Sequence, residues 1–343
     1  MGIREQVQAE SDDTDLRAAL NRALRALDKA KAHTAELVEA VYRASHDAAL
    51  TVTYAPTSRP PKRKPTRDAE VAVALVGDWQ LGKRTPDYNA AVCEERIQRF
   101  AAKVRELTAI QRADHPVNEC HVWLLGDLVE GELIFPGQAH RIDLSLFGQV
   151  VGEGPRILGD LLRSLLADFE RVHVVGVIGN HGAIGGPFRR EMHPESNADM
   201  MLYRIVADRL SDEKRLTWHL PNLAGERAWY AIDRIGAYSC LLFHGDQIRG
   251  GFAGFPFYGL AKKVWGWKSG AIAEPFGDVA LGHWHQPTRV TLNTTTARVN
   301  GTTESSNTYA AEQLAATGQP AQHLMFVHPE RGIVTAEYVV YLK

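Results

Sequence analysis

The chain has 343 residues, of which 45% are hydrophobic and 23% are charged, a composition typical of a folded globular protein. Its 39 Lys and Arg side chains nearly balance its 41 Asp and Glu side chains, so a strongly basic nucleic-acid-binding domain is excluded, although a local basic patch is not. The start of the chain has no signal-peptide pattern, and no apolar run approaches the ~20 residues that span a bilayer. Its three cysteines form no Cys-x-x-Cys pair, and the composition predicts a cytoplasmic protein.

Residues 1–54 are predicted to form an N-terminal amphipathic helix. Between residues 12 and 50 there is no Gly or Pro, and apolar residues recur at spacings of three and four, as at Leu16, Leu20 and Leu24. Two interpretations are open. The helix packs on the rest of its own chain, or it forms a coiled-coil seam that makes a homodimer or docks a partner.

Residues 55–69 are predicted to form a linker. Four prolines forbid a helix and favour an extended chain, and five residues are Arg or Lys. A solvated tether is the common outcome for such a charge run, and contact with a phosphate backbone is the alternative.

Residues 70–343 are predicted to form one α/β domain with two mixed β-sheets packed face to face and flanked by helices. Helices are expected at residues 90–112, 144–167 and 197–210, and a turn at residues 233–236. The expected strands are residues 71–76, 121–125, 174–178, 229–232, 238–243, 279–281, 289–292, 297–300, 324–328 and 335–342.

Five of these apolar runs end on residues that can bind a metal ion. The residues that follow them are Asp78-x-Gln80, Asp127, Asn180-His181, His244 and His283-x-His285. Because ligands in open α/β folds bind beyond the carboxyl ends of the strands, we expect these side chains to converge. Oxygen and imidazole donors without a thiolate suit two adjacent divalent cations.

The order Asp-x-Gln, Gly-Asp, Gly-Asn-His, His and Gly-His-x-His resembles that of the calcineurin-like metallophosphoesterase superfamily, from about Val71 to Gly301. The stretch 78–83 and the Asn300-Gly301 pair also resemble uncharacterised phage-encoded members, which implies a host cytoplasm, and a distant similarity to DNA repair exonucleases is present. The resemblance implies a metallophosphoesterase-like β-sandwich with the N-terminal helix as an extension.

The resemblance also implies a role for each residue of these blocks. One metal would be held by Asp78, Gln80, Asp127 and His285. The second metal would be held by Asp127, Asn180, His244 and His283. Asp127 would bridge the cations, a metal-bridging hydroxide would attack phosphorus, and His181 would be catalytic. Mn²⁺ is the expected metal, with Mg²⁺, Fe²⁺ or Zn²⁺ as alternatives.

The sequence departs from the family pattern at two positions. Gln80 stands where His is usual, which favours Mn²⁺ or Mg²⁺ at the first site or places Gln80 behind a bound water. Gly182 stands where an acid normally orients the histidine, so His181 would need another carboxylate, and the candidates are Asp246, Glu130 and Glu132.

Four basic residues near the blocks are candidates for substrate binding, namely Lys83, Arg84, Arg189 and Arg190. Residues 251–268 alternate aromatic side chains with three lysines. We expect most of this segment to be core or subunit interface, with one or two residues that face substrate.

The predicted function is dimetal-dependent hydrolysis of phosphodiester bonds, with nucleic acid as the first choice of substrate. A small-molecule or cyclic-nucleotide phosphodiesterase is the alternative. A third hypothesis is a partner-recruiting protein with a vestigial site, which the departures at Gln80 and Gly182 raise.

Overall fold

The computed structural model describes residues 57–60, 68–132, 134–135, 137–184, 193, 195–221, 229–249, 255–306 and 319–343, and scattered residues between 21 and 47. The chain divides into two compact units, Met1–Ala44 and Ser45–Lys343. In the first unit the described residues are helical and exposed, with Leu24 at 47% exposure. Most positions of the predicted seam lie outside the described residues, as does most of the predicted linker.

The first sheet of the larger unit is built around the parallel strands that carry the first ligand blocks. Its strand order is β11-β10-β1-β2-β3-β4 in the described part of the chain. β1 pairs parallel with β2 and antiparallel with β10, so the sheet is mixed. The strands are β1 (Glu70–Val76), β2 (Val117–Leu124), β3 (Arg171–Gly176), β4 (Leu216–His219), β10 (Ala321–His328) and β11 (Ile333–Tyr341).

The second sheet carries the histidine blocks and is also mixed. Its order is β5-β6-β7-β9-β8, with parallel pairing between β6 and β7 and antiparallel pairing between β5 and β6. The strands are β5 (Tyr230–Ile235), β6 (Tyr238–Phe243), β7 (Asp278–Leu281), β8 (Thr288–Leu292) and β9 (Thr295–Val299).

The two sheets face each other across a shared apolar core. Leu75, Trp123 and Val175 of the first sheet pack in one cluster with Cys240 and Leu242 of the second. Val71, Val73 and Leu75, every second residue of β1, enter this cluster, as the alternation of side chains along a strand requires. The predicted architecture of two packed mixed sheets is therefore confirmed.

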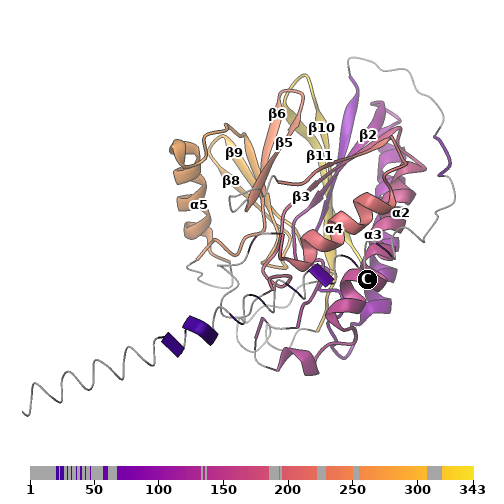
Figure 1. The fold of residues 1–343 in the computed structure, drawn as a ribbon. Helices are drawn as coiled ribbons and strands as arrows, with labels where there is room; N and C mark the ends of the chain where they lie inside the picture. Colours follow the sequence, from indigo (N-terminus) through magenta and orange to yellow (C-terminus); the bar gives the residue numbers. More distant parts are fainter. Residues whose placement is uncertain are drawn as a thin grey trace, which may run out of the picture. The chain divides into compact units, whose positions relative to one another are not determined.

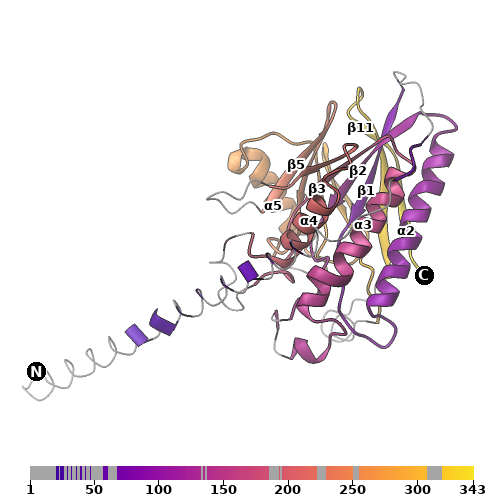
Figure 2. The ribbon, with the colours of Figure 1, turned by 45° about the vertical axis from the view of Figure 1, so that its right-hand side comes forward.

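Helices cover the outer faces of both sheets (Figure 1, Figure 2). The helices α2, α3 and α4 lie over the six-stranded sheet, and α5 lies over the five-stranded sheet, where Leu260 and Val264 pack with Phe243. The bounds are α2 (Ala90–Gln111), α3 (Gly154–Leu166), α4 (Ala198–Arg209) and α5 (Phe257–Gly266), with π-helical turns η2 (Gly148–Glu153) and η4 (Trp267–Ala271) and the 3-10 turn η1 (Gln138–His140). Among the described residues, no helix is both long and apolar enough to cross a membrane.

The structure corrects the predicted turn at residues 233–236. Asp233 and Arg234 belong to β5, and the chain reverses only at Gly236, where φ is 59°. Asp233 stays in the strand because its buried carboxylate accepts a hydrogen bond from the Trp123 indole at 2.6 Å and pairs with His121 Nδ1 at 2.5 Å. β4 and α5 are not among the elements predicted from the sequence.

Candidate metal centre

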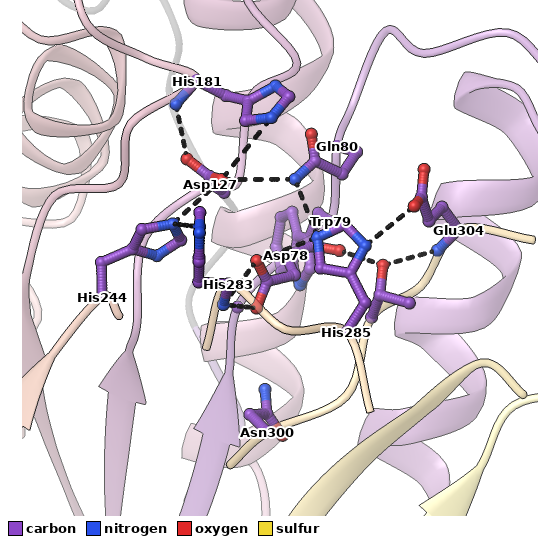
Figure 3. A network of polar contacts seen from close by, with 12 residues as sticks. Asp78, Trp79, Gln80, Asp127, His181, His244, His283, His285, Asn300 and Glu304 are labelled. Carbon is purple, nitrogen blue, oxygen red and sulfur yellow. Dashed lines mark hydrogen bonds and ion pairs between the residues drawn. The ribbon is translucent and has the colours of Figure 1, made fainter. Parts of the chain in front are cut away.

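All seven candidate ligands come together beyond the carboxyl ends of β1, β2, β3, β6 and β7, and Figure 3 labels all of them except Asn180. One group surrounds the Nε2 atom of His244. This atom lies 3.0 Å from Asp127 Oδ2, 3.1 Å from Asn180 Oδ1 and 3.2 Å from His283 Nδ1. Four residues from four strand ends therefore present donor atoms to one point, as the resemblance implies for the second cation.

The other group surrounds the Nε2 atom of His285. It lies 3.3 Å from Asp78 Oδ1 and 3.3 Å from Gln80 Nε2, and that amide nitrogen donates to Asp127 Oδ2 at 3.4 Å. Asp127 Oδ2 thus contacts both groups. The geometry puts Asp127 in the shared position that a bridging carboxylate would need.

Five of the candidate ligands have a left-handed backbone conformation. The φ angles are 50° at Asp78, 51° at Gln80, 54° at Asp127, 69° at His283 and 57° at His285. Such angles are uncommon outside glycine and are held only where the surroundings fix them, which occurs mainly at functional sites. The strain is an observation independent of the motif pattern, and it falls on the same residues.

Glycines beside the ligands leave room for their carboxylates. A Cβ atom at Gly282 would lie 2.3 Å from Asp78 Oδ2, and one at Gly179 would lie 2.1 Å from Asp127 Oδ1. Both distances are far below van der Waals contact. The Gly of the Gly-Asn-His block and of the Gly-His-x-His block is thus required by the approach of a ligand from another strand.

Asp199 holds two of the ligand loops together, a role that the sequence analysis missed. From the start of α4, its buried carboxylate accepts backbone N–H groups of Asp127 and Gly179 at 2.9 Å each. It also accepts those of Leu128 at 2.9 Å and Val129 at 3.3 Å. In the sequence, Asp199 is recognisable only as an acid in the first turn of a predicted helix. Acids are common there because they interact favourably with the helix N-terminus, so the position did not indicate a buried role.

Glu304 is a second missed residue. Its Oε1 lies 2.8 Å from His285 Nδ1, and its Oε2 lies 2.5 Å from Lys83 Nζ. A carboxylate behind a candidate histidine ligand fixes the ring orientation and raises its basicity. Lys83, a candidate for substrate binding, is paired with this carboxylate and has only 15% of its side chain exposed.

The electrostatic field of the centre favours positive charge. Burial opposes protonation of His244, but nearby carboxylates, foremost Asp127, raise its pKa to about 10. Burial likewise opposes protonation of His285, but Glu304 and Asp78 raise its pKa to about 10. Burial and the charge of His244 lower the pKa of His283 to about 3. A bound cation would take the place of the protons on His244 and His285, whereas the neutral ring of His283 is already free to bind one.

The side-chain amide of Gln80 has an oxygen that could bind a divalent cation. Gln80 Oε1 is buried and makes no hydrogen bond to the described residues, while its Nε2 points at Asp127 and His285. Rotation of the amide by a half turn exchanges these two atoms. The oxygen would then face the space between Asp127 and His285, where a hard cation would need a ligand.

His181 lies beside the ligands. Its backbone N–H donates to Asp127 Oδ1 at 2.7 Å, and its Nδ1 lies 3.0 Å from Glu130 O and 3.3 Å from Glu130 Oε2. Of the three carboxylates considered for orienting His181, the structure places Glu130 against the ring. Glu132 instead accepts the backbone N–H of Leu146, and Asp246 is exposed.

Gly182 has no room for the acid that the family pattern carries at this position. A Cβ atom there would lie 2.7 Å from Asn197 Oδ1. Among the remaining substrate-binding candidates, Arg84 is exposed on the loop after β1. Arg189 and Arg190 lie outside the described residues.

Comparisons with known proteins give distant structural likeness. No protein-family model matches the chain, and no curated protein matches it. A hypothetical protein from Pyrococcus horikoshii is similar with a TM-score of 0.38 and 11% identity, over 80% of this chain and 89% of that one. Vps29 from Entamoeba histolytica complexed with Zn²⁺ has a TM-score of 0.35 and 13% identity, over 79% and 99% of the chains. An archaeal phosphodiesterase has a TM-score of 0.35 and 9% identity, over 78% and 99%. The candidate centre therefore rests on its own geometry.

Proposed function

We propose that the chain is a divalent-metal-dependent hydrolase of phosphodiester bonds that acts on nucleic acid. The observation that carries the proposal is the convergence of five strand ends around Asp127, whose Oδ2 lies 3.0 Å from His244 Nε2 and 3.4 Å from Gln80 Nε2. Two divalent cations would neutralise the phosphate charge and lower the pKa of an attacking water.

The residues around Asp127 hold its carboxylate in one orientation. The His181 N–H fixes Oδ1 at 2.7 Å, which leaves Oδ2 directed toward the two ligand groups. Asp199 Oδ2 accepts the backbone N–H of Asp127 at 2.9 Å and so holds the backbone of that residue. A preorganised carboxylate of this kind costs no reorganisation when the reaction occurs.

We propose His181 as the general acid. With Nδ1 turned to Glu130, its Nε2 faces the centre 4.0 Å from Asp127 Oδ2. Burial opposes protonation of the ring, but Asp127 and Glu130 outweigh it and raise the pKa of His181 to about 8. In the proposed step a water gives one proton to solvent and its oxygen bonds to phosphorus, the bond to the leaving oxygen breaks, and Nε2 gives its proton to that oxygen and regains one from solvent.

The decisive experiment compares a chromogenic phosphodiester with the matching monoester, each with Mg²⁺, Mn²⁺ or a chelator. We expect metal-dependent turnover of the diester that Asp127→Asn abolishes. The matched control is Asp208→Asn, which changes an exposed acid of α4 in the same way. Turnover that survives both the chelator and Asp127→Asn would overturn the proposal, as would hydrolysis of the monoester alone.

The substrate class is tested with labelled single- and double-stranded DNA. Metal-dependent cleavage supports the nucleic-acid assignment. Turnover of small or cyclic diesters without cleavage of nucleic acid would replace it with a small-molecule phosphodiesterase. Absence of turnover on every diester would instead favour a binding protein with a vestigial site.

A further inference from the structure

Helix α5 exposes large aromatic side chains that its own fold does not use. Tyr258 is 80% exposed, Trp265 is 73% exposed and Phe257 is 54% exposed. The opposite face of the helix buries Leu260 and Val264 in the core of the five-stranded sheet. Contiguous exposed apolar patches on a soluble protein mark interaction surfaces.

The exposed face combines these rings with positive charge. Tyr258, Lys262 and Trp265 are spaced by four and three residues, so they lie on one side of the helix, and all three are exposed. Lys263 is exposed beside them. Residues 247–273 contain no Asp or Glu, and the first acid that follows, Glu274, pairs with Arg234 at 2.7 Å.

An aromatic series connects this face to the candidate metal centre. The ring of His283 lies 5.3 Å from that of Trp284, which lies 5.6 Å from Phe255, and Phe255 lies 4.8 Å from Phe257. The indole Nε1 of Trp284 is buried and has no hydrogen-bond partner among the described residues. The start of α5 is therefore linked to a candidate ligand by a chain of ring contacts.

We propose that α5 docks single-stranded nucleic acid, with bases stacked on Tyr258 and Trp265 and phosphates held by Lys262 and Lys263. Seven residues of helix span ~10 Å, which corresponds to about three nucleotide steps at 3.4 Å per step. The strand would then run past Phe257 toward the metal centre. The inference rests on the proposed function, because it names the substrate class of that same centre.

The chemistry of the face favours this occupant over a protein. Lysine is depleted in the core of protein interfaces, whereas stacking rings with interleaved positive charge are typical of surfaces that bind single strands. Both faces of a base pair inside a duplex are covered by neighbouring pairs, so the body of a duplex would contact the lysines alone. The face is consequently expected to discriminate single strands from duplexes.

The test is fluorescence anisotropy of a labelled oligodeoxythymidine with the full chain in chelator, where binding does not depend on turnover. Alanine at Tyr258 or at Trp265 should each weaken binding by about 5- to 100-fold. The matched control is Tyr341→Ala, because Tyr341 is also an exposed aromatic, at 58%, but lies on β11. Trp265→Phe should retain most of the affinity, since it keeps a stacking ring.

A salt titration tests the lysines separately. Each phosphate contact on a single strand contributes about 0.7 to the slope of log affinity against log salt. Replacing both Lys262 and Lys263 with Gln should therefore reduce the magnitude of that slope by about 1.4. Equal binding of duplex and single strand, or unchanged binding in the α5 variants, would overturn the proposal. So would a change of sedimentation coefficient in those variants, which would identify an interface between copies. DNA cleavage with unchanged binding would refute the docking site alone, whereas reduced binding without any diester turnover would refute the proposed function alone.

Discussion

Replacement of Asp199 by Asn tests how the loops that carry Asp127 and Asn180 are held. Each carboxylate oxygen of Asp199 accepts two backbone N–H groups. Oδ1 accepts those of Leu128 and Val129, and Oδ2 accepts those of Asp127 and Gly179. In the variant one oxygen becomes an NH₂ group, so two buried N–H donors face another donor whichever way the amide turns.

The magnitude follows from these two lost acceptors. Leaving a buried donor unsatisfied costs about 1–3 kcal/mol, so the free energy of unfolding should fall by about 2–6 kcal/mol. For a unit of this size the midpoint of thermal unfolding should move by about 2 °C per kcal/mol, which gives a decrease of roughly 4–12 °C. Asp127, whose φ of 54° depends on this support, should also shift and lower diester turnover by about 10²-fold.

Circular dichroism melting curves and diester turnover should be measured for the wild type, Asp199→Asn and Asp208→Asn. The exposed Asp208 on the same helix controls for the loss of one negative charge. If Asp199→Asn melts within about 1 °C of Asp208→Asn and keeps its turnover, the buried carboxylate does not hold the loops and the reasoning is refuted.

Gln80→His should tighten the binding of Mn²⁺ or Zn²⁺, because imidazole is a stronger ligand than an amide. The measurement is a titration against a metal indicator. Unchanged affinity would mean that Gln80 does not contact the metal. Glu304→Gln should weaken binding by about 10- to 100-fold in the same titration, because His285 loses the carboxylate that orients it, and equal affinity would contradict that role. Burial opposes protonation of His121, but Asp233 and a second carboxylate outweigh it and raise the pKa from 6.5 to about 9. The stabilisation that protonated His121 provides is complete below pH 6.5 and is lost as pH rises through 9. In urea unfolding, the wild type should therefore exceed Asp233→Asn in stability by up to about 3 kcal/mol at pH 6, and this excess should shrink toward pH 10. A difference that stays constant with pH would contradict the prediction.

The strand ends could be predicted because two local signals coincide there. Apolar runs such as residues 71–76 and 279–281 mark buried strands, and a glycine next to a residue that can bind a metal marks where each strand stops. Parallel neighbours then bring Asp78, Asp127 and Asn180 to one edge without further information. The convergence of these three follows from topology, whereas His244 and His283 reach them through the packing of the second sheet on the first.

The residues that support the ligands could not be predicted in this way. Asp199 and Glu304 contact their partners across distances of 72 and 19 residues in the sequence, and neither follows a strand in the expected pattern. The helix α5 was missed because its Gly and aromatic content has low helix propensity, which packing of Leu260 and Val264 on the second sheet overrides. The supporting residues and α5 were both missed because they depend on tertiary contacts, which produce no hydrophobic periodicity in the sequence.

The left-handed backbone at the candidate ligands also explains why the supporting residues are needed. A non-glycine residue in this conformation costs on the order of 1–3 kcal/mol, so the loop of residues 78–80 would relax without external hydrogen bonds. Thr302 Oγ1 donates to Asp78 O at 2.7 Å, and Thr303 Oγ1 donates to Trp79 O at 2.8 Å. The segment after β9 thus restrains the first ligand loop as Asp199 restrains the loop after β2. Hydrogen bonds from two separate segments, one at Asp199 and one at Thr302 and Thr303, therefore hold the candidate ligand loops in place without a cation. A preorganised metal centre requires this arrangement.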